Sequence, residues 1–209
     1  MANTKAGFPA QLKRKHNSLF GPGPNGLLNA CVGRNGGFPG FDRIARGYFE
    51  AGGILVKRLQ QDRGHLDFLI YPLVQTYRHA IETMLKHLVP LLSRLRDESD
   101  EMQYTHQLVD NWEIVRKHLI ALEVEETEFA DVDRVLTDLV EIDATGETFR
   151  YPQARDGSRH LVETTHINVE VFAEGMTVLE RFFDGCSCWA SEMLNQKLEM
   201  ESYLAGEGP

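Results

Sequence analysis

One long stretch of helical apolar spacing, residues 67–95, constrains the fold of this chain more than any other feature. Its apolar residues recur at intervals of three and four, the spacing that places them on one face of an α-helix. They are Leu69, Leu73, Val74, Tyr77, Ile81, Met84, Leu85, Leu88 and Leu92. No other window of the chain keeps this spacing so long, so we expect this helix to lie at the centre of the core.

Apolar residues also recur at helical spacing, in shorter uninterrupted runs, within residues 41–63, 106–122, 127–142 and 165–203. Gly64 is expected to close the first helix, and Pro90 to bend or restart the central one. Residues 143–163 are rich in turn formers, with a tight turn at Asp156-Gly157. The sequence therefore predicts an all-α fold, a helical bundle of about five helices over residues 41–203. Residues 204–209 are expected to form a loose tail.

Residues 1–40 differ in composition from the rest of the chain. Gly and Pro are dense in GPGPNG and GRNGGFPG, which predicts an irregular Gly/Pro-rich N-terminal arm. Basic residues precede these runs, and scattered apolar residues such as Phe20 and Leu27 indicate packing against a partner. A phosphate-binding loop would need Lys-Ser/Thr after its last Gly, and the arm has none. We therefore expect the arm to bind a protein partner.

Composition narrows the classes of protein that the chain can belong to. With 42% hydrophobic and 25% charged residues over 209, it has the makeup of a globular protein. A net charge of −9 does not support broad binding to RNA, although a local site stays open. Three cysteines, Cys31, Cys186 and Cys188, have no disulfide-framework spacing and predict reduced thiols and a cytoplasmic location. No apolar run reaches the ~18 residues of a membrane span, so we expect no membrane partner.

A polar cluster interrupts the central helix. Arg78, Glu82 and Lys86 are four residues apart and share one stripe, with His79 beside Glu82. The stripe is a set of ion pairs that neutralises itself, a polar site for a ligand or nucleotide, or a catalytic site. A short joint makes the next helix antiparallel, which brings His106 near. The candidate ligand-binding residues are therefore Arg78, His79, Glu82 and His106.

We expect no metal and no cofactor. A di-metal carboxylate bundle needs Glu-x-x-His on two helices plus two further Glu, and the chain has one such unit, Glu163 and His166. Cys186 and Cys188 supply only half of a closed zinc site.

Two stretches together resemble a known family. YRHAIETMLKHL followed by THQLVDNW resembles the RHxIE…LK…HxL…W pattern of bacterial HEPN-like helical proteins. FRYPQARDG resembles the FRYPxxxxG loop that precedes the last helix in several of them. The resemblance covers roughly residues 71–183. It implies a bundle of four to five helices, frequent homodimers, and roles in RNA cleavage, toxin–antitoxin pairs or defence against phage.

The resemblance also implies candidate catalytic residues. HEPN ribonucleases carry an Arg followed a few residues later by a His, which acts as general base on the ribose 2′-hydroxyl while the Arg stabilises the phosphate. Arg155-Asp156-x-x-x-His160 has the polar second residue of this motif, so Arg155 and His160 are the candidate pair. The central helix has no His at the required spacing after Arg78.

These observations leave three functional hypotheses. The first is a HEPN-like helical module, in a bacterial defence or toxin–antitoxin setting, that acts by binding a ligand or partner. The alternatives are a metal-independent endoribonuclease using an Arg/His pair, and an interaction protein that binds through its N-terminal arm. Whether the chain is an enzyme stays open. We expect a homodimer, because the last helix carries more large apolar side chains than one bundle face would bury: Phe172, Met176, Phe182, Phe183 and Trp189.

Overall fold

The computed structural model describes residues 20–33 and 40–206 of the 209-residue chain. The chain divides into two units, Met1–Phe38 and Pro39–Pro209, which we describe separately. In the first unit, the described residues form one short 3-10 helix, η1 (Gly26–Leu28), and otherwise irregular backbone. Phe20 and Leu27 are almost fully exposed. The basic part of the arm lies outside the described residues.

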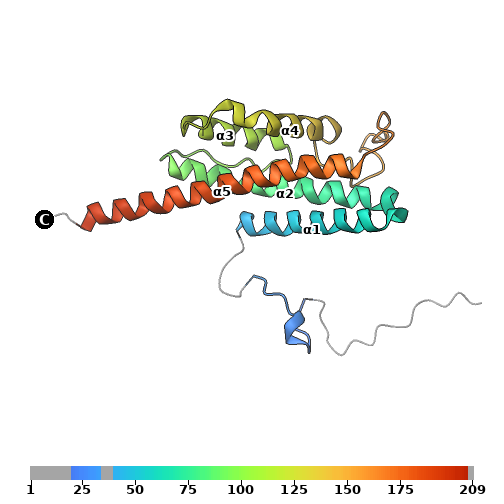
Figure 1. The fold of residues 1–209 in the computed structure, drawn as a ribbon, viewed down its shortest axis with the longest axis horizontal. Helices are drawn as coiled ribbons and strands as arrows, with labels where there is room; N and C mark the ends of the chain where they lie inside the picture. Colours follow the sequence, from blue (N-terminus) through green and yellow to red (C-terminus); the bar gives the residue numbers. More distant parts are fainter. Residues whose placement is uncertain (1–19, 34–39, 207–209) are drawn as a thin grey trace, which may run out of the picture. The chain divides into compact units, whose positions relative to one another are not determined.

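The second unit contains five α-helices within residues 40–206 (Figure 1). They are α1 (Phe41–Gln61), α2 (Leu66–Leu95), α3 (Leu108–Ala121), α4 (Ala130–Ile142) and α5 (Val169–Gly206). Short 3-10 helices, η2 (Arg63–His65) and η3 (Glu126–Phe129), precede α2 and α4. The described residues contain no β-strand, and their one strand-like contact is an isolated bridge between Gln153 and Arg159. The predicted all-α fold is confirmed.

The helix boundaries differ from the prediction at three points. Gly64 lies within η2, where its N–H donates to Oδ1 of Asp62, so α1 already ends at Gln61. Pro90 does not end or restart α2, which continues to Leu95. The exposed Pro90 ring removes one backbone hydrogen bond, and the buried apolar face on either side outweighs that loss. Helix α5 continues through Leu204 to Gly206, so the expected tail begins later than predicted.

Helix α2 is the centre of the core, as predicted. It packs against α1, α3 and α5, while α4 packs against α3 and α5. Figure 1 shows α1 on one side of α2 and the α3–α4 pair on the other. Leu73, Ile81 and Leu88, from the predicted apolar stripe, are fully buried.

The glycine pair in α1 has different roles at its two positions. A Cβ added at Gly52 would stand 2.6 Å from Cε2 of Tyr77 on α2, whereas one at Gly53 would meet no atom within 4 Å. Gly52 therefore allows the two helices to approach closely, and this approach offsets the ~1 kcal/mol that a helical glycine costs.

The homodimer prediction rests on five large apolar side chains of α5 being exposed, but most of them are buried or partly buried within a single chain. Met176 and Phe183 are 2% and 0% exposed, and Phe172 and Phe182 pack partly buried against the core. Phe182 and Phe183 make edge-on ring contacts with Trp112 at 6.0 and 5.8 Å between centroids. Of the five, only Trp189 keeps substantial exposure, at 38%.

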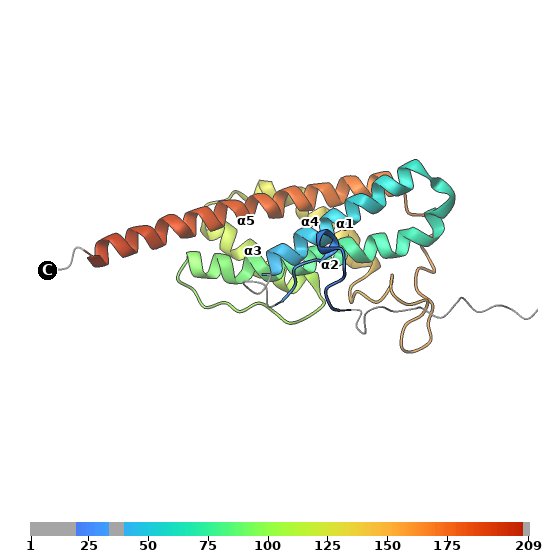
Figure 2. The same cartoon turned by 90° about the horizontal axis from the view of Figure 1, so that it is seen from below.

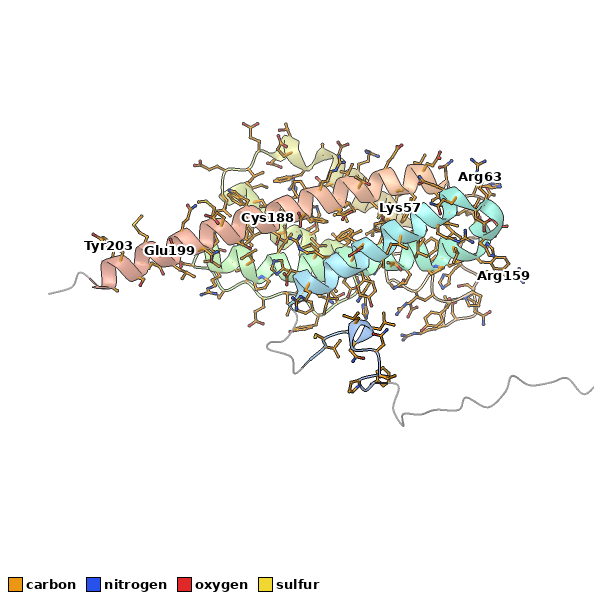
Figure 3. The ribbon with its side chains drawn as sticks, turned by 60° about the horizontal axis from the view of Figure 1, so that its bottom comes forward. Lys57, Arg63, Arg159, Cys188, Glu199 and Tyr203 are labelled. Carbon is orange, nitrogen blue, oxygen red and sulfur yellow. The ribbon has the colours of Figure 1, made fainter. Side chains whose placement is uncertain are left out.

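The C-terminal end of α5 projects beyond the other helices of the bundle in both perpendicular views (Figures 1 and 2). Glu199 and Tyr203 lie on this projecting end, whereas Arg63 and Arg159 lie towards the opposite end of the bundle (Figure 3). The projecting turns expose apolar side chains, among them Met200 at 63%. Among the described residues, no helix combines the length and apolar character that crossing a bilayer requires.

Candidate functional site

The Arg78 guanidinium is the centre of a buried polar cluster. Its side chain is 1% exposed, although it lies on the most apolar helix. Nε donates to the Asp143 carbonyl at 3.2 Å, and Nη2 donates to the carbonyls of His106 and Ala144 at 2.7 and 3.1 Å. Arg78 therefore joins α2 to the segment just before α3 and to the loop that follows α4, and it donates to main-chain carbonyls in both.

Two buried carboxylates accompany this guanidinium. Oδ2 of Asp143 lies 3.3 Å from Nε, and Oε2 of Glu82 lies 3.5 Å from Nη1. Glu82 also accepts a 2.7 Å hydrogen bond from Nζ of Lys86. Two cations thus face two anions, which is the arrangement that buried charges require. Burial lowers the pKa of Arg78, and the charges of Asp143 and Glu82 oppose that shift.

The loop after α4 is shaped around the guanidinium. Gly146 has φ +78°, and a Cβ there would stand 2.7 Å from Nη1 of Arg78. The carboxylate of Asp143 accepts the Thr148 N–H at 3.1 Å through Oδ1, while its Oδ2 has no hydrogen-bond partner. Arg150 Nε donates to the Gly146 carbonyl at 2.5 Å and closes the loop. The loop therefore holds a position that only glycine adopts without strain.

The outer side of the cluster reaches solvent. Nδ1 of His106 lies 3.2 Å from Oε1 of Glu82, while the His106 side chain is 68% exposed. The rings of His79 and Tyr48 meet edge-on at 4.5 Å between centroids, and Tyr48 is 39% exposed. We call Tyr48, His79 and His106 the polar rim. The structure thus brings Arg78, His79, Glu82 and His106 together, as the sequence predicted, and divides them between a buried core and this rim.

Burial and charge shift the proton affinities in this cluster in identifiable ways. Burial alone would raise the pKa of Glu82, but the hydrogen bonds and charges of Lys86 and His106 outweigh it and hold that pKa below its usual value. Burial lowers the pKa of His79, because the protonated ring loses hydration that the Glu82 charge only partly replaces. A neutral His79 ring and an ionised Glu82 are therefore favoured.

Arg155 and His160 lie in the turn between α4 and α5 and do not form a unit. Gly157, with φ +87°, reverses the chain between them, as the predicted turn requires. The Arg155 side chain is 92% exposed and pairs with Glu147 at 3.2 Å. Nε2 of His160 is buried without a hydrogen-bond partner. Within the described part of the chain, no hydrogen bond or ion pair joins the side chains of Arg155 and His160.

A second buried polar group, at the C-terminal end of α2, was not predicted. His118 on α3 is fully buried, and its Nδ1 lies 2.9 Å from Nη1 of Arg96, which makes Nδ1 the acceptor. Its Nε2 is 3.0 Å from Oγ of Ser93 and 3.2 Å from Oδ2 of Asp100. Burial lowers the pKa of this His. His118 lies three residues after Val115 and one before Leu119, both fully buried, and this spacing is the sequence signal for its burial.

Possible metal ligands occur at the same end of α2. Atoms of Glu98, Asp100 and His118 lie within 4.8 Å of one another. Lys117 is 2.6 Å from Asp100, and Arg96 pairs with Glu98, so side-chain cations already neutralise both carboxylates. This arrangement does not favour a divalent cation.

The other candidate metal ligands, the Glu163–His166 unit and the cysteines, do not form a metal site among the described residues. Glu163 and His166 lie in the irregular segment before α5, so their spacing is not that of a helical ligand pair. All three cysteines are free thiols. Burial raises the pKa of Cys186 to about 12, which makes it a poor source of thiolate.

Comparisons with known proteins identify no relative of this chain. No family model, curated protein or solved structure matches the chain. Its own geometry therefore carries the functional interpretation, and the residues of the polar cluster are the part of that geometry in which sequence pattern and structure agree.

Proposed function

We propose that this chain is a HEPN-like helical module that binds a small phosphorylated ligand of the nucleotide class at the polar rim. The observation that carries the proposal is the His106 imidazole. It is 68% exposed, yet a buried carboxylate 3.2 Å from Nδ1 fixes its orientation. Both ring nitrogens donate in the imidazolium form, so Nδ1–H can stay on Glu82 while Nε2–H is presented to solvent at a defined position. A donor preorganised in this way loses little entropy on binding.

The buried half of the cluster supports the rim. Arg78 fixes the main chain of His106 through the 2.7 Å bond to its carbonyl, and Lys86 fixes the Glu82 carboxylate. The rim therefore rests on groups that are already paired. Arg78 itself is too buried to touch a ligand, so its role is to position the residue that does.

The rim chemistry suits a nucleotide better than a long nucleic acid. Tyr48 and His79 offer ring surfaces on which a base can stack, and His106 offers an N–H donor for a phosphate. The buried charges of the cluster balance, and the whole chain carries −9. An extended polyanion would meet net repulsion, whereas a single phosphate needs only local donors.

The test is calorimetric titration of the full chain with AMP, with adenosine and inorganic phosphate as partial ligands. His106→Ala is expected to weaken AMP binding by about tenfold or more, the loss of a charge-assisted contact. His65→Ala is the matched control, because His65 is also exposed and its Nδ1 also lies near a carboxylate, Asp62, at 3.4 Å. Absence of AMP binding, or equal effects of both substitutions, would refute the proposal.

The endoribonuclease alternative is tested with His106→Ala and with one further variant, His160→Ala. Arg155 and His160 make separate contacts, so binding is the better-supported function. Short RNA incubated with the chain in the presence of a chelator is expected to stay intact. Cleavage that His160→Ala or His106→Ala abolishes would replace the binding proposal with a nuclease.

Protein partners form the remaining part of the proposal. A bacterial defence or toxin–antitoxin setting, and a partner held by the N-terminal arm, rest on the sequence alone. A homodimer through α5 would use side chains that this helix still exposes, such as Trp189, Met200 and Tyr203, since its phenylalanines pack within or against the core. Light scattering at micromolar concentration tests the homodimer, and repeating it without residues 1–40 tests whether the arm contributes to self-association.

A further inference from the structure

A cavity separate from the polar rim lies between α4, the first half of α5 and the segment that precedes α5. Its volume is about 570 Å³, within the range of small-molecule sites. Its walls are mainly apolar, and include Val74, Val135, Leu139, Phe149, Phe172 and Met176. It shares no lining residue with the rim.

The walls of this cavity are held in place by close packing and by a helix cap. A Cβ at Gly175 would stand 3.3 Å from Cγ1 of Val135, so α4 and α5 approach each other closely here. Oδ1 of Asn168 accepts the N–H groups of Glu170 and Val171 at 2.9 and 3.1 Å and fixes the start of α5. The cavity is therefore formed before any ligand arrives.

The charges around the cavity are predominantly negative. Asp138 on α4 and Glu174 on α5 are exposed lining residues, and neither forms an ion pair within the described residues. Arg134, the one Lys or Arg in the lining, pairs with Asp131 at 3.3 Å, outside the lining. The two helices thus each place an unpaired carboxylate on an apolar cavity.

We propose that this cavity binds an organic ammonium ion with an apolar body. The apolar part fills the space between α4 and α5, where burial from water supplies the affinity. The ammonium group stays at the solvent-facing edge near Asp138 and Glu174, whose charges exclude carboxylates and phosphates of similar shape. The site is independent of the nucleotide proposed for the rim, because the two have no residue in common.

The charge preference is tested by calorimetry with three probes of equal chain length, decylammonium, 1-decanol and decanoate, each below its aggregation concentration. Decylammonium is expected to bind about fivefold or more tightly than decanol, as two exposed ion pairs allow, and decanoate least. The double variant Asp138→Asn, Glu174→Gln removes this preference. Glu170→Gln, on the same helix but outside the lining, keeps it.

The location is tested by filling the cavity. Val171 lines it and is 66% exposed, whereas Val162 is 70% exposed and lies outside it. Val171→Trp is expected to weaken decylammonium binding about tenfold, and Val162→Trp to leave it unchanged. No binding, equal binding of the three probes, or indifference to Val171→Trp would overturn the proposal. If Val171→Trp fails to fold by circular dichroism, the two carboxylate substitutions decide.

Discussion

Arg78 and Arg155 are both arginines that the sequence pattern indicates as candidate functional residues, and they occupy opposite environments in the structure. The Arg78 side chain is 1% exposed, whereas that of Arg155 is 92% exposed. Arg78 donates to three main-chain carbonyls and lies beside two buried carboxylates. Arg155 has one ion pair, to Glu147 at 3.2 Å. One guanidinium connects three segments, and the other lies on the surface of one turn.

The difference shows how a motif arginine can be structural at one position and dispensable for folding at another. A buried guanidinium must be fully paired, and the same pairing makes the surrounding loops depend on it. An exposed guanidinium is solvated with or without its partner, so removing it leaves no buried polar group without a hydrogen-bond partner. The sequence pattern alone does not distinguish the two cases, since both residues are arginines near a histidine.

The largest effect is expected from Arg78→Met. It leaves the buried carboxylates of Asp143 and Glu82 with less positive charge and removes the donor from three main-chain carbonyls, a loss of about 3–5 kcal/mol in the free energy of unfolding. Arg94→Met, at an exposed position of the same helix, is the control and is expected to change little. Urea unfolding of both variants measures the difference.

A second variant sharpens this expectation. If Arg78 and Glu82 formed an isolated pair, replacing both with apolar residues would restore much of the stability. Arg78→Met, Glu82→Leu is instead expected to be at least as unstable as Arg78→Met, because Asp143, Lys86 and the carbonyls stay unmatched. Substantial rescue by Glu82→Leu would show that the contacts with the loop contribute little.

Gly146→Ala ranks next. The backbone strain of φ +78° costs about 1–2 kcal/mol for a residue with a Cβ, and the added atom would also meet Nη1 at 2.7 Å. Gly157→Ala is the matched control, with φ +87° and no atom within 4 Å, so it carries the strain alone. In thermal unfolding, the midpoint temperature of Gly146→Ala should be clearly lower than that of Gly157→Ala. Equal losses of stability would mean that Arg78 moves away from the added Cβ without a cost in free energy.

The local part of this cluster could be predicted from sequence, and the long-range part could not. Spacing by four placed Arg78, Glu82 and Lys86 on one stripe, because a helix fixes neighbours at that interval. The carbonyls of His106 and Ala144 lie 28 and 66 residues further along the chain, and no local pattern encodes their approach. The sequence therefore predicts Asp143 only as the start of a turn-rich segment.

The last helix gives the same lesson for apolar residues. Periodicity identified its apolar positions, and we expected a homodimer because their number exceeded one bundle face. Helix α5 in fact packs against α1, α2 and α4, so several of its faces are buried within one chain. How many neighbours a helix has is a property of the tertiary arrangement, which a single helical pattern does not contain.

A smaller effect is expected from pH. Burial lowers the pKa of His79, His87 and His118 in the folded chain. The unfolded chain takes up protons near pH 6.5 that the folded chain does not, so stability should fall as the pH drops below about 6.5. Unfolding in urea at pH 5, 6.5 and 8 measures the slope. His118→Gln should flatten it and the exposed His65→Gln should not, whereas stability that rises on acidification would contradict the burial of these rings.

The smallest effect is expected from Arg155→Ala. Its ion pair with Glu147 lies at the surface on the arginine side, so solvent screening limits its contribution to about 0.5 kcal/mol or less. A double-mutant cycle with Glu147→Gln measures the coupling directly. A coupling above about 1 kcal/mol would mean that the turn between α4 and α5 depends on Arg155 as the core depends on Arg78, and the contrast between the two arginines would fail. Small coupling with normal ligand binding would leave Arg155 without a role in either folding or recognition, and would confine the functional part of the pattern to helix α2 and the segments that Arg78 joins.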